Sequence, residues 1–228
     1  MQKRIIILGT GGNSIDILDT IGDINTRTSK YRCIGFLDDN EQNWGKEYHG
    51  IKVLGPLNSA QQYDDCLFVN GIGSPSNFWR KRTIIAKTNI PDERFATIVH
   101  PTSSVSKMAR LGHGTVVFQN VTITSNVQIG KHVIILPNSI ISHDDFVGDY
   151  TCITGGVCIS GGVTVGHSCY LGTNSAIISN VQIGNYCLVG MGSVVLESVG
   201  DNSVVVGNPA RFLRDTLPDP DEAEAAGA

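Results

Sequence analysis

The sequence predicts an α/β domain followed by a parallel β-helix, and two patterns carry this prediction. Strand-like and helix-like segments alternate over the first part of the chain, and a six-residue aliphatic repeat fills most of the rest. The composition agrees, because 26 glycines and only 17% charged residues among 228 suit short strands and tight turns. We expect domains at residues 1–95 and 96–214 and an acidic tail at residues 215–228.

The segment RIIILGTGGNSIDILDTI predicts a strand, a glycine turn and a helix. Gly11, Gly12 and Asn13 fall at the turn, where glycine lets the backbone approach a phosphate at a helix N-terminus. The full dinucleotide pattern is absent, because Ser14 replaces its third glycine. The turn therefore favours a nucleotide site that is not an NAD site, with a purely structural turn as the alternative.

Two further strands are expected in the same domain. YRCIGFLDD ends on Asp38 and Asp39, CLFVNGIGS ends near Gly73, and SNFWRKRTIIAKT then reads as a helix. Parallel α/β sheets bind ligands beyond the carboxyl ends of their strands. Asp38, Asp39 and Gly73 are therefore predicted to bind substrate together with the glycine turn. A solvated loop pair is the alternative for the two aspartates.

The second part of the chain carries the six-residue repeat. From Val105 to Val195 every sixth residue is Val, Ile or Leu, which makes sixteen positions. An α-helix cannot follow a period of six, whereas short strands joined by tight corners can. Three hexads close a triangular coil of eighteen residues, and successive coils stack about 4.8 Å apart. Each aliphatic residue of the series is expected to point inward.

One stretch of the repeat, IISHDDFVGD, holds three ionisable side chains. His143 is expected to face outward with Asp144 at the corner, and a carboxylate beside a histidine fixes the tautomer of a general base. On residue type alone, an ordinary surface histidine is the alternative. His113 and His167 also face outward but lack a neighbouring acid. Asp145 takes an inward corner, where it either accepts hydrogen bonds from backbone amides or supports His143.

Together these motifs resemble those of the hexapeptide-repeat acyltransferases. Among them the chain is most similar to the bacillosamine-type nucleotide-amino-sugar N-acetyltransferases and the sialic acid O-acetyltransferases. The likeness covers about residues 4 to 214 and rests on GTGGN, LDD, GIG, HD and GNPAR. It implies an α/β N-terminal Rossmann-like domain followed by a left-handed parallel β-helix, whose handedness is an exception to the usual crossover rule.

The resemblance also implies roles for single residues. His143 would take a proton from a sugar amine with Asp144 behind it, and the N–H of Gly161, one coil further on, would stabilise the oxyanion. The acetyl-CoA arm would run past Cys152, Gly161, Thr173 and Met191. Transfer would be direct, without a covalent enzyme intermediate or a catalytic metal. The resemblance further implies a homotrimer with acetyl-CoA between neighbouring β-helices.

Three functions are compatible with these features. The first is acetyl-CoA-dependent N-acetylation of the 4-amino group of a nucleotide-linked, preferably UDP-linked, 4-amino-4,6-dideoxy sugar in surface glycan biosynthesis. The second is O-acetylation of sialic acid or a related sugar by the same machinery. The third is a non-catalytic scaffold or sugar-nucleotide sensor, which would not bind acetyl-CoA.

Charge and hydropathy limit which classes of partner and location are expected. The net charge is −4, but the last fourteen residues hold five acids and no base, so 17 basic residues face 16 acidic ones elsewhere. No basic stripe indicates nucleic acid, and no apolar run reaches the roughly 20 residues of a membrane span. The start lacks a signal-peptide core, so a cytoplasmic protein is expected. The six cysteines show no metal-ligand spacing, and the tail composition predicts disorder.

Overall fold

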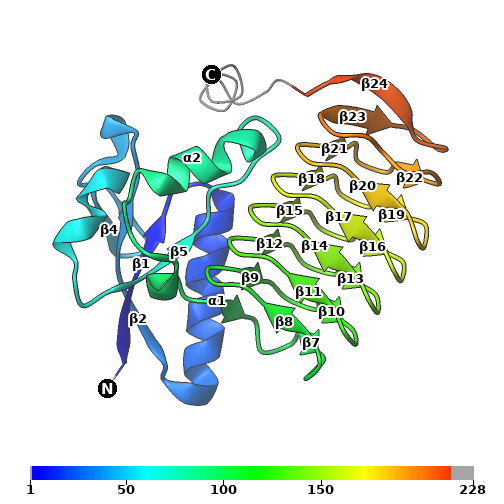
Figure 1. Cartoon of the computed structure of the whole chain (residues 1–228). Coiled ribbons are helices and arrows are strands. Elements are labelled where there is room, and N and C mark those ends of the chain that lie inside the picture. The colour runs from blue at the N-terminus through cyan, green and yellow to red at the C-terminus, as the bar shows by residue number, and fades with distance from the viewer. Residues whose placement is uncertain (1, 217–228) are drawn as a thin grey trace.

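The computed structural model describes residues 2–216 and shows a small α/β domain beside a prism of stacked coils (Figure 1). The sheet of the α/β domain has the order β3-β4-β2-β1-β5, in which only β3 runs antiparallel to its neighbour. Its strands are β1 (Lys3–Leu8), β2 (Tyr31–Leu37), β3 (Glu47–Tyr48), β4 (Ile51–Gly55) and β5 (Leu67–Asn70). Its helices are α1 (Gly12–Thr28) and α2 (Lys81–Ala86), with short 3-10 turns η1 (Glu41–Asn43), η2 (Leu57–Gln62), η3 (Phe78–Arg80) and η4 (Asp92–Arg94).

The repeat forms the coiled prism that its period predicts. Each of the sixteen strands from β7 to β22 ends on one residue of the aliphatic series. Strands eighteen residues apart pair in parallel, as in Ile123 with Ile141, and the inward side chains form one continuous core. The hydrophobic effect therefore holds the coils together along their whole length.

The prism has three faces, which we name for use below. The domain face comprises β6 (Ile98–Val99), β9 (Val116–Val117), β12 (Ile134–Ile135), β15 (Cys152–Ile153), β18 (Tyr170–Leu171), β21 (Leu188–Val189), β23 (Ser203–Val206) and β24 (Arg211–Asp215). The β13 face comprises β7 (Ser104–Val105), β10 (Thr122–Ile123), β13 (Ile140–Ile141), β16 (Cys158–Ile159), β19 (Ala176–Ile177) and β22 (Val194–Val195). The β14 face comprises β8 (Arg110–Leu111), β11 (Gln128–Ile129), β14 (Phe146–Val147), β17 (Thr164–Val165) and β20 (Gln182–Ile183).

The corners of the prism follow the same period as its strands. Every sixth residue from Gly114 to Gly192 has a positive φ, which is the left-handed region that turns the chain sharply. Most of these positions hold Gly, Asn or Asp, the residues that tolerate this region best. Asp144 is one of them, with φ 62°, so its residue type also serves the corner.

The two parts of the chain share a core. The outward side chains Ile98, Val116 and Ile134 of the domain face are buried together with Ile17 and Ile21 of α1. The domain face is thus the surface on which the α/β domain packs, as Figure 1 shows.

The elements depart from the sequence expectation at several points. Strands β3 and β4 were not expected, and β6 begins the repeat one hexad before Val105. Strand β24 runs through Asp215, and Thr216 is buried, so the first two residues of the segment expected to be a disordered tail belong to the fold. The rest of that tail, residues 217–228, lies outside the described residues. Within residues 2–216, none of the helices has the length and apolar character needed to cross a membrane.

Candidate active site

A cleft of about 650 Å³ lies between the α/β domain and the domain face. It is lined by all six residues that the sequence indicates for substrate binding, which are Gly11, Gly12, Asn13, Asp38, Asp39 and Gly73. They meet because β1, β2 and β5 are parallel and end at one edge of the sheet. Outward residues of the β-helix, among them Cys152 and Tyr170, form the opposite wall.

The first turn of α1 opens into this cleft. Gly11 is the N-cap and offers no side-chain cap, and a Cβ added to Gly11 or Gly12 would meet nothing within 4 Å. A seventeen-residue helix presents unbonded N–H groups and the positive end of its dipole at such a terminus. Ser14 is buried, where its hydroxyl donates to Leu8 O at 3.2 Å. The terminus is therefore open to an anionic group such as a phosphate.

Protein contacts hold both aspartates at the end of β2. Asp38 accepts a hydrogen bond from the Thr10 hydroxyl at 2.6 Å. Asp39 accepts from the Leu57 N–H at 3.0 Å and pairs with Lys87 Nζ at 2.8 Å. Protein contacts therefore hold both aspartates in the cleft wall, although 40% of the Asp39 side chain remains exposed.

Several cleft residues were not singled out from the sequence. They include Thr10, Ser74, Asn77, Arg80 and Lys87. Only their position in the sequence could have indicated them, because each follows a strand or lies in the segment predicted as a helix after Gly73. The fold was needed to show that this segment borders the glycine turn.

His143 and Asp144 form a hydrogen-bonded pair on the surface of the prism. His143 Nδ1 lies 2.8 Å from Asp144 Oδ2, and 67% of the histidine side chain is exposed. Asn126, one coil below, donates to Asp144 Oδ1 at 3.0 Å. The hydrogen bond from His143, followed by that from Asn126, lowers the pKa of Asp144. The carboxylate of Asp144 therefore reaches the imidazole of His143 and is favoured in its ionised form.

Gly161 lies directly against the imidazole of His143. A Cβ on Gly161 would come within 2.6 Å of Cε1 and Nε2 of the ring. None of the hydrogen bonds found among residues 2–216 uses the Gly161 N–H as donor. The Nε2 edge of the histidine and the backbone of Gly161 thus lie side by side at the corner between the β13 and β14 faces.

Asp145 is buried at the inward corner, as the repeat predicts. Only 1% of it is exposed, and its Oδ1 accepts a hydrogen bond from the Val163 N–H at 2.8 Å. Burial raises the pKa of Asp145 to about 7, against the lowering effect of the bound backbone amides. The geometry matches the first of the two alternatives, in which Asp145 binds backbone amides, and no hydrogen bond joins it to His143.

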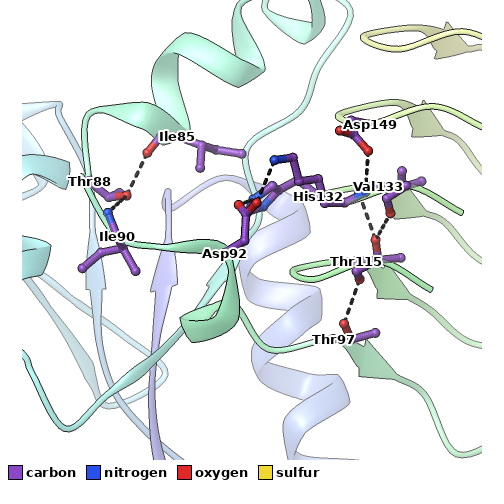
Figure 2. A network of polar contacts seen from close by, with 12 residues as sticks. Ile85, Thr88, Ile90, Asp92, Thr97, Thr115, His132, Val133 and Asp149 are labelled. Carbon is purple, nitrogen blue, oxygen red and sulfur yellow. Dashed lines mark hydrogen bonds and ion pairs between the residues drawn. The ribbon is translucent and has the colours of Figure 1, made fainter.

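The other histidines have different surroundings. His167 lies 3.4 Å from Ser168 Oγ instead of a carboxylate. His132, which the sequence did not single out, is buried between Phe95 and Tyr150, and burial lowers its pKa to about 4. Figure 2 shows His132 and Asp92 in a network that joins the α/β domain to the prism. Asp92 accepts from Lys131 Nζ at 2.7 Å in this network, so His132 belongs to the junction.

The four residues expected along acetyl-CoA do not all lie together in one chain, although Thr173 adjoins the cleft, because its hydroxyl donates to that of Thr154 in the cleft wall at 3.2 Å. Thr173 and Met191 lie at the corner between the domain face and the β13 face, and Gly161 lies across that face beside His143. Cys152 lies in the cleft, against Gly73. A single chain therefore does not bring the four together. Among residues 2–216, no three His, Cys, Asp or Glu side chains are arranged to hold a metal ion.

The chain joins a small parallel α/β domain to a hexapeptide-repeat β-helix. Family models match both parts: the PglD N-terminal domain over residues 4–85 and the bacterial transferase hexapeptide (six repeats) over residues 162–197. These matches confirm the resemblance inferred from the motifs.

Known proteins extend the same comparison. The UDP-N-acetylbacillosamine N-acetyltransferase of Bacillus subtilis is 30% identical over 118 residues, so the matched segment spans about half of each chain, 51% in both cases. PerB from Caulobacter crescentus, solved with CoA and GDP-perosamine, has a TM-score of 0.80 at 23% identity, with 92% of this chain and 97% of that chain covered. The acetyltransferase domain of PglB from Neisseria gonorrhoeae, solved with acetyl coenzyme A, has a TM-score of 0.81 at 19% identity, covering 93% and 100%. At these identities the structural likeness confirms the fold, including the left-handed β-helix.

Proposed function

We propose that this protein is an acetyl-CoA-dependent N-acetyltransferase acting on the 4-amino group of a nucleotide-linked 4-amino-4,6-dideoxy sugar, with UDP as the expected nucleotide. The observation that carries the proposal is the His143–Asp144 pair, with Nδ1 and Oδ2 2.8 Å apart and 67% of the histidine side chain exposed. The cleft at the N-terminus of α1 supports a nucleotide-linked substrate. The named activities of the Bacillus and Caulobacter relatives point the same way.

The chemistry follows from the contacts of His143. With the Nδ1 proton directed at Asp144, Nε2 carries the lone pair and takes the proton from the attacking amine. The amine attacks the thioester carbonyl of acetyl-CoA, and the Gly161 N–H donates to the oxyanion that develops. Collapse of this intermediate releases CoA and leaves the acetyl group on the amine. The step needs no covalent bond to the protein.

The same geometry supports a homotrimer as the working unit. The cleft lies on the domain face, whereas His143 lies at the opposite corner, between the β13 and β14 faces. A sugar bound in the cleft of one chain would meet the His143 of a neighbour once the prisms pack side by side. With the prisms packed in this way, the corner that holds Thr173 and Met191 would complete the acetyl-CoA site. We expect the enzyme to act in the cytoplasm, where acetyl-CoA is available.

The test is release of free CoA from acetyl-CoA, with UDP-, GDP- and dTDP-linked 4-amino-4,6-dideoxy sugars and sialic acid as separate acceptors. Wild type should turn over one of the amino sugars. His143→Asn should lose about 10²–10⁴-fold in kcat, because the general base is absent. His167→Asn is the matched control and should keep wild-type activity. Turnover of sialic acid alone would move the assignment to O-acetylation, and failure to bind acetyl-CoA would contradict the enzyme assignment.

A further inference from the structure

Lys81 is a fully buried lysine at the junction between the two parts of the chain. It lies in α2 with 0% of its surface exposed, and its Nζ is 3.5 Å from Cys152 Sγ on β15. Burying an ammonium group is unfavourable unless a carboxylate or several hydrogen bonds compensate it. Here the partner is a thiol. Lys81 has no role in the proposed acetyl transfer, whereas Cys152 lines the cleft.

The cysteine separates this amine from the substrate cleft. Cys152 lines the cleft with 3% of its surface exposed, and a Cβ on Gly73 would lie 2.6 Å from its sulfur. The sulfur therefore lies at the wall of the cleft, with Lys81 Nζ held against it and Gly73 packed beside both. Other cysteines differ from this one, because Cys158 is exposed and Cys169 and Cys187 lie in the core of the prism.

The protonation state of the Lys81 amine favours its reaction as a nucleophile. Burial lowers the pKa of Lys81, and the neighbouring Cys152 offsets this only in part. A larger share of the amine is therefore neutral, with a free lone pair on nitrogen, than at an exposed lysine.

We propose that Lys81 and Cys152 are a peroxide-sensitive modification site, at which one oxygen atom bridges Nζ and Sγ. The overall change is Cys–SH + Lys–NH₂ + 2 H₂O₂ → Cys–S–O–NH–Lys + 3 H₂O. The S–H bond and one N–H bond break, and an S–O and an O–N bond form. Sulfur and nitrogen each lose two electrons, and the two peroxides are reduced. Two equivalents of a dithiol reverse the change and release one water.

The bridge would tie α2 to β15 across the wall of the cleft. A separation of 3.5 Å leaves room for one bridging atom, whereas a direct S–N bond needs a much closer approach. Because Gly73 packs on the same sulfur, the bridge would also restrain the loop after β5. The expected effect on substrate binding, which rests on the proposed function, is weaker binding of the nucleotide sugar.

Mass spectrometry of the full chain after treatment with hydrogen peroxide tests the proposal. A non-reducing digest should contain Lys81 and Cys152 in one cross-linked species with one added oxygen and two hydrogens fewer, and dithiothreitol should remove it. Cys152→Ser and Lys81→Met should abolish the species, whereas Cys158→Ser should keep it. A cross-link without the added oxygen, or oxidation of Cys152 with no cross-link in wild type, would overturn the proposal.

A second readout does not depend on the variants or on catalysis. A covalent tie between distant segments restricts the unfolded chain, so peroxide should raise the unfolding temperature of wild type by about 5 °C, reversibly with dithiothreitol. An unchanged unfolding temperature would contradict the bridge. If the cross-link forms in a protein that shows no acetyl transfer, the proposed function fails while this inference holds.

Discussion

Gly161 shows at the scale of single residues how closely the backbone of the next coil approaches the proposed base on one side. The ring of His143 occupies the volume that any side chain at Gly161 would need, since a Cβ there would lie 2.6 Å from Nε2. Glycine at this position is therefore required by the close approach, and not by its backbone angles. The same absence of a side chain leaves the N–H of Gly161 accessible to an acceptor.

Gly161→Ala should therefore abolish most of the activity while the protein still folds. The methyl group must displace the imidazole, and losing the position of a general base costs about 10²–10⁴-fold in rate. The measurements are kcat for CoA release and the circular dichroism spectrum, which reports whether the variant is folded. Gly22→Ala in α1, where a Cβ meets nothing within 4 Å, is the matched control and should leave the rate unchanged. Equal rates for both variants would remove Gly161 from the site.

The carboxyl group of Asp145 makes the free energy of unfolding depend on pH. Its pKa is about 7 in the folded protein, against about 3.9 for an unfolded aspartate. The folded state then holds one proton more between these values, so the free energy of unfolding falls as the pH rises from about 4 to about 7. The shift corresponds to a loss of at most about 4 kcal/mol.

Asp145→Asn should remove this dependence. The amide oxygen can keep the hydrogen bond from the Val163 N–H, and no charge develops at high pH. Urea unfolding at pH 5 and pH 8 is the measurement, with similar midpoints for variant and wild type at pH 5 and a more stable variant at pH 8. Parallel changes in the two proteins would show that Asp145 is already ionised at pH 5.

At the scale of secondary-structure elements, the N-terminus of α1 determines the affinity of the cleft for an anionic ligand. Gly12 opens the helix, and no acidic side chain lies in its first turn. A carboxylate there stabilises a helix by about 0.3–1 kcal/mol through the dipole, but it would also repel a phosphate in the cleft. Helix stability and ligand affinity should therefore change in opposite directions.

Gly12→Asp tests this conflict, with Gly12→Asn as the uncharged control of the same shape. We expect Gly12→Asp to raise the unfolding temperature slightly and to weaken binding of UDP at least tenfold, as measured by calorimetry. Gly12→Asn should bind UDP more tightly than Gly12→Asp. If the two variants bind equally well, the phosphate does not lie at the N-terminus of α1.

At the scale of the whole molecule, we propose that the active site is shared between neighbouring chains. Exposed apolar side chains gather on and beside the β13 face, which lies between the His143 corner and the Thr173–Met191 corner; they include Ile140, Ile178 and Leu196. Exposed apolar groups of this kind are typical of an interface between subunits. A neighbour packed on this face would bring the two corners into one site.

Light scattering should therefore give three times the 24.4 kDa of one chain. Ile178→Glu places a charge on the proposed interface and should shift the protein toward monomer and reduce CoA release together. Leu54→Glu, at an exposed leucine of the α/β domain, should remain trimeric. A fully active monomer would contradict the shared site.

Much of this molecule could be predicted from residue order alone. The six-residue period predicted the strand ends from β7 to β22, because inward aliphatic residues and left-handed corners recur at fixed intervals. His143, Asp144 and Gly161 are near in sequence or one coil apart, so periodicity was enough to bring them together. The six cleft residues followed from the rule that parallel strands end at one edge.

Tertiary packing decided the remainder. The repeat places Cys152 on an outward position of β15, but only the packing of the α/β domain buries it against Gly73 in the cleft wall. Lys81 is buried for the same reason, since its helix meets β15 only in the folded chain. The sequence by itself determined the prism, its corners and the local His143 pair. Only the tertiary structure decided which face the α/β domain covers, because that choice depends on long-range burial of apolar surface.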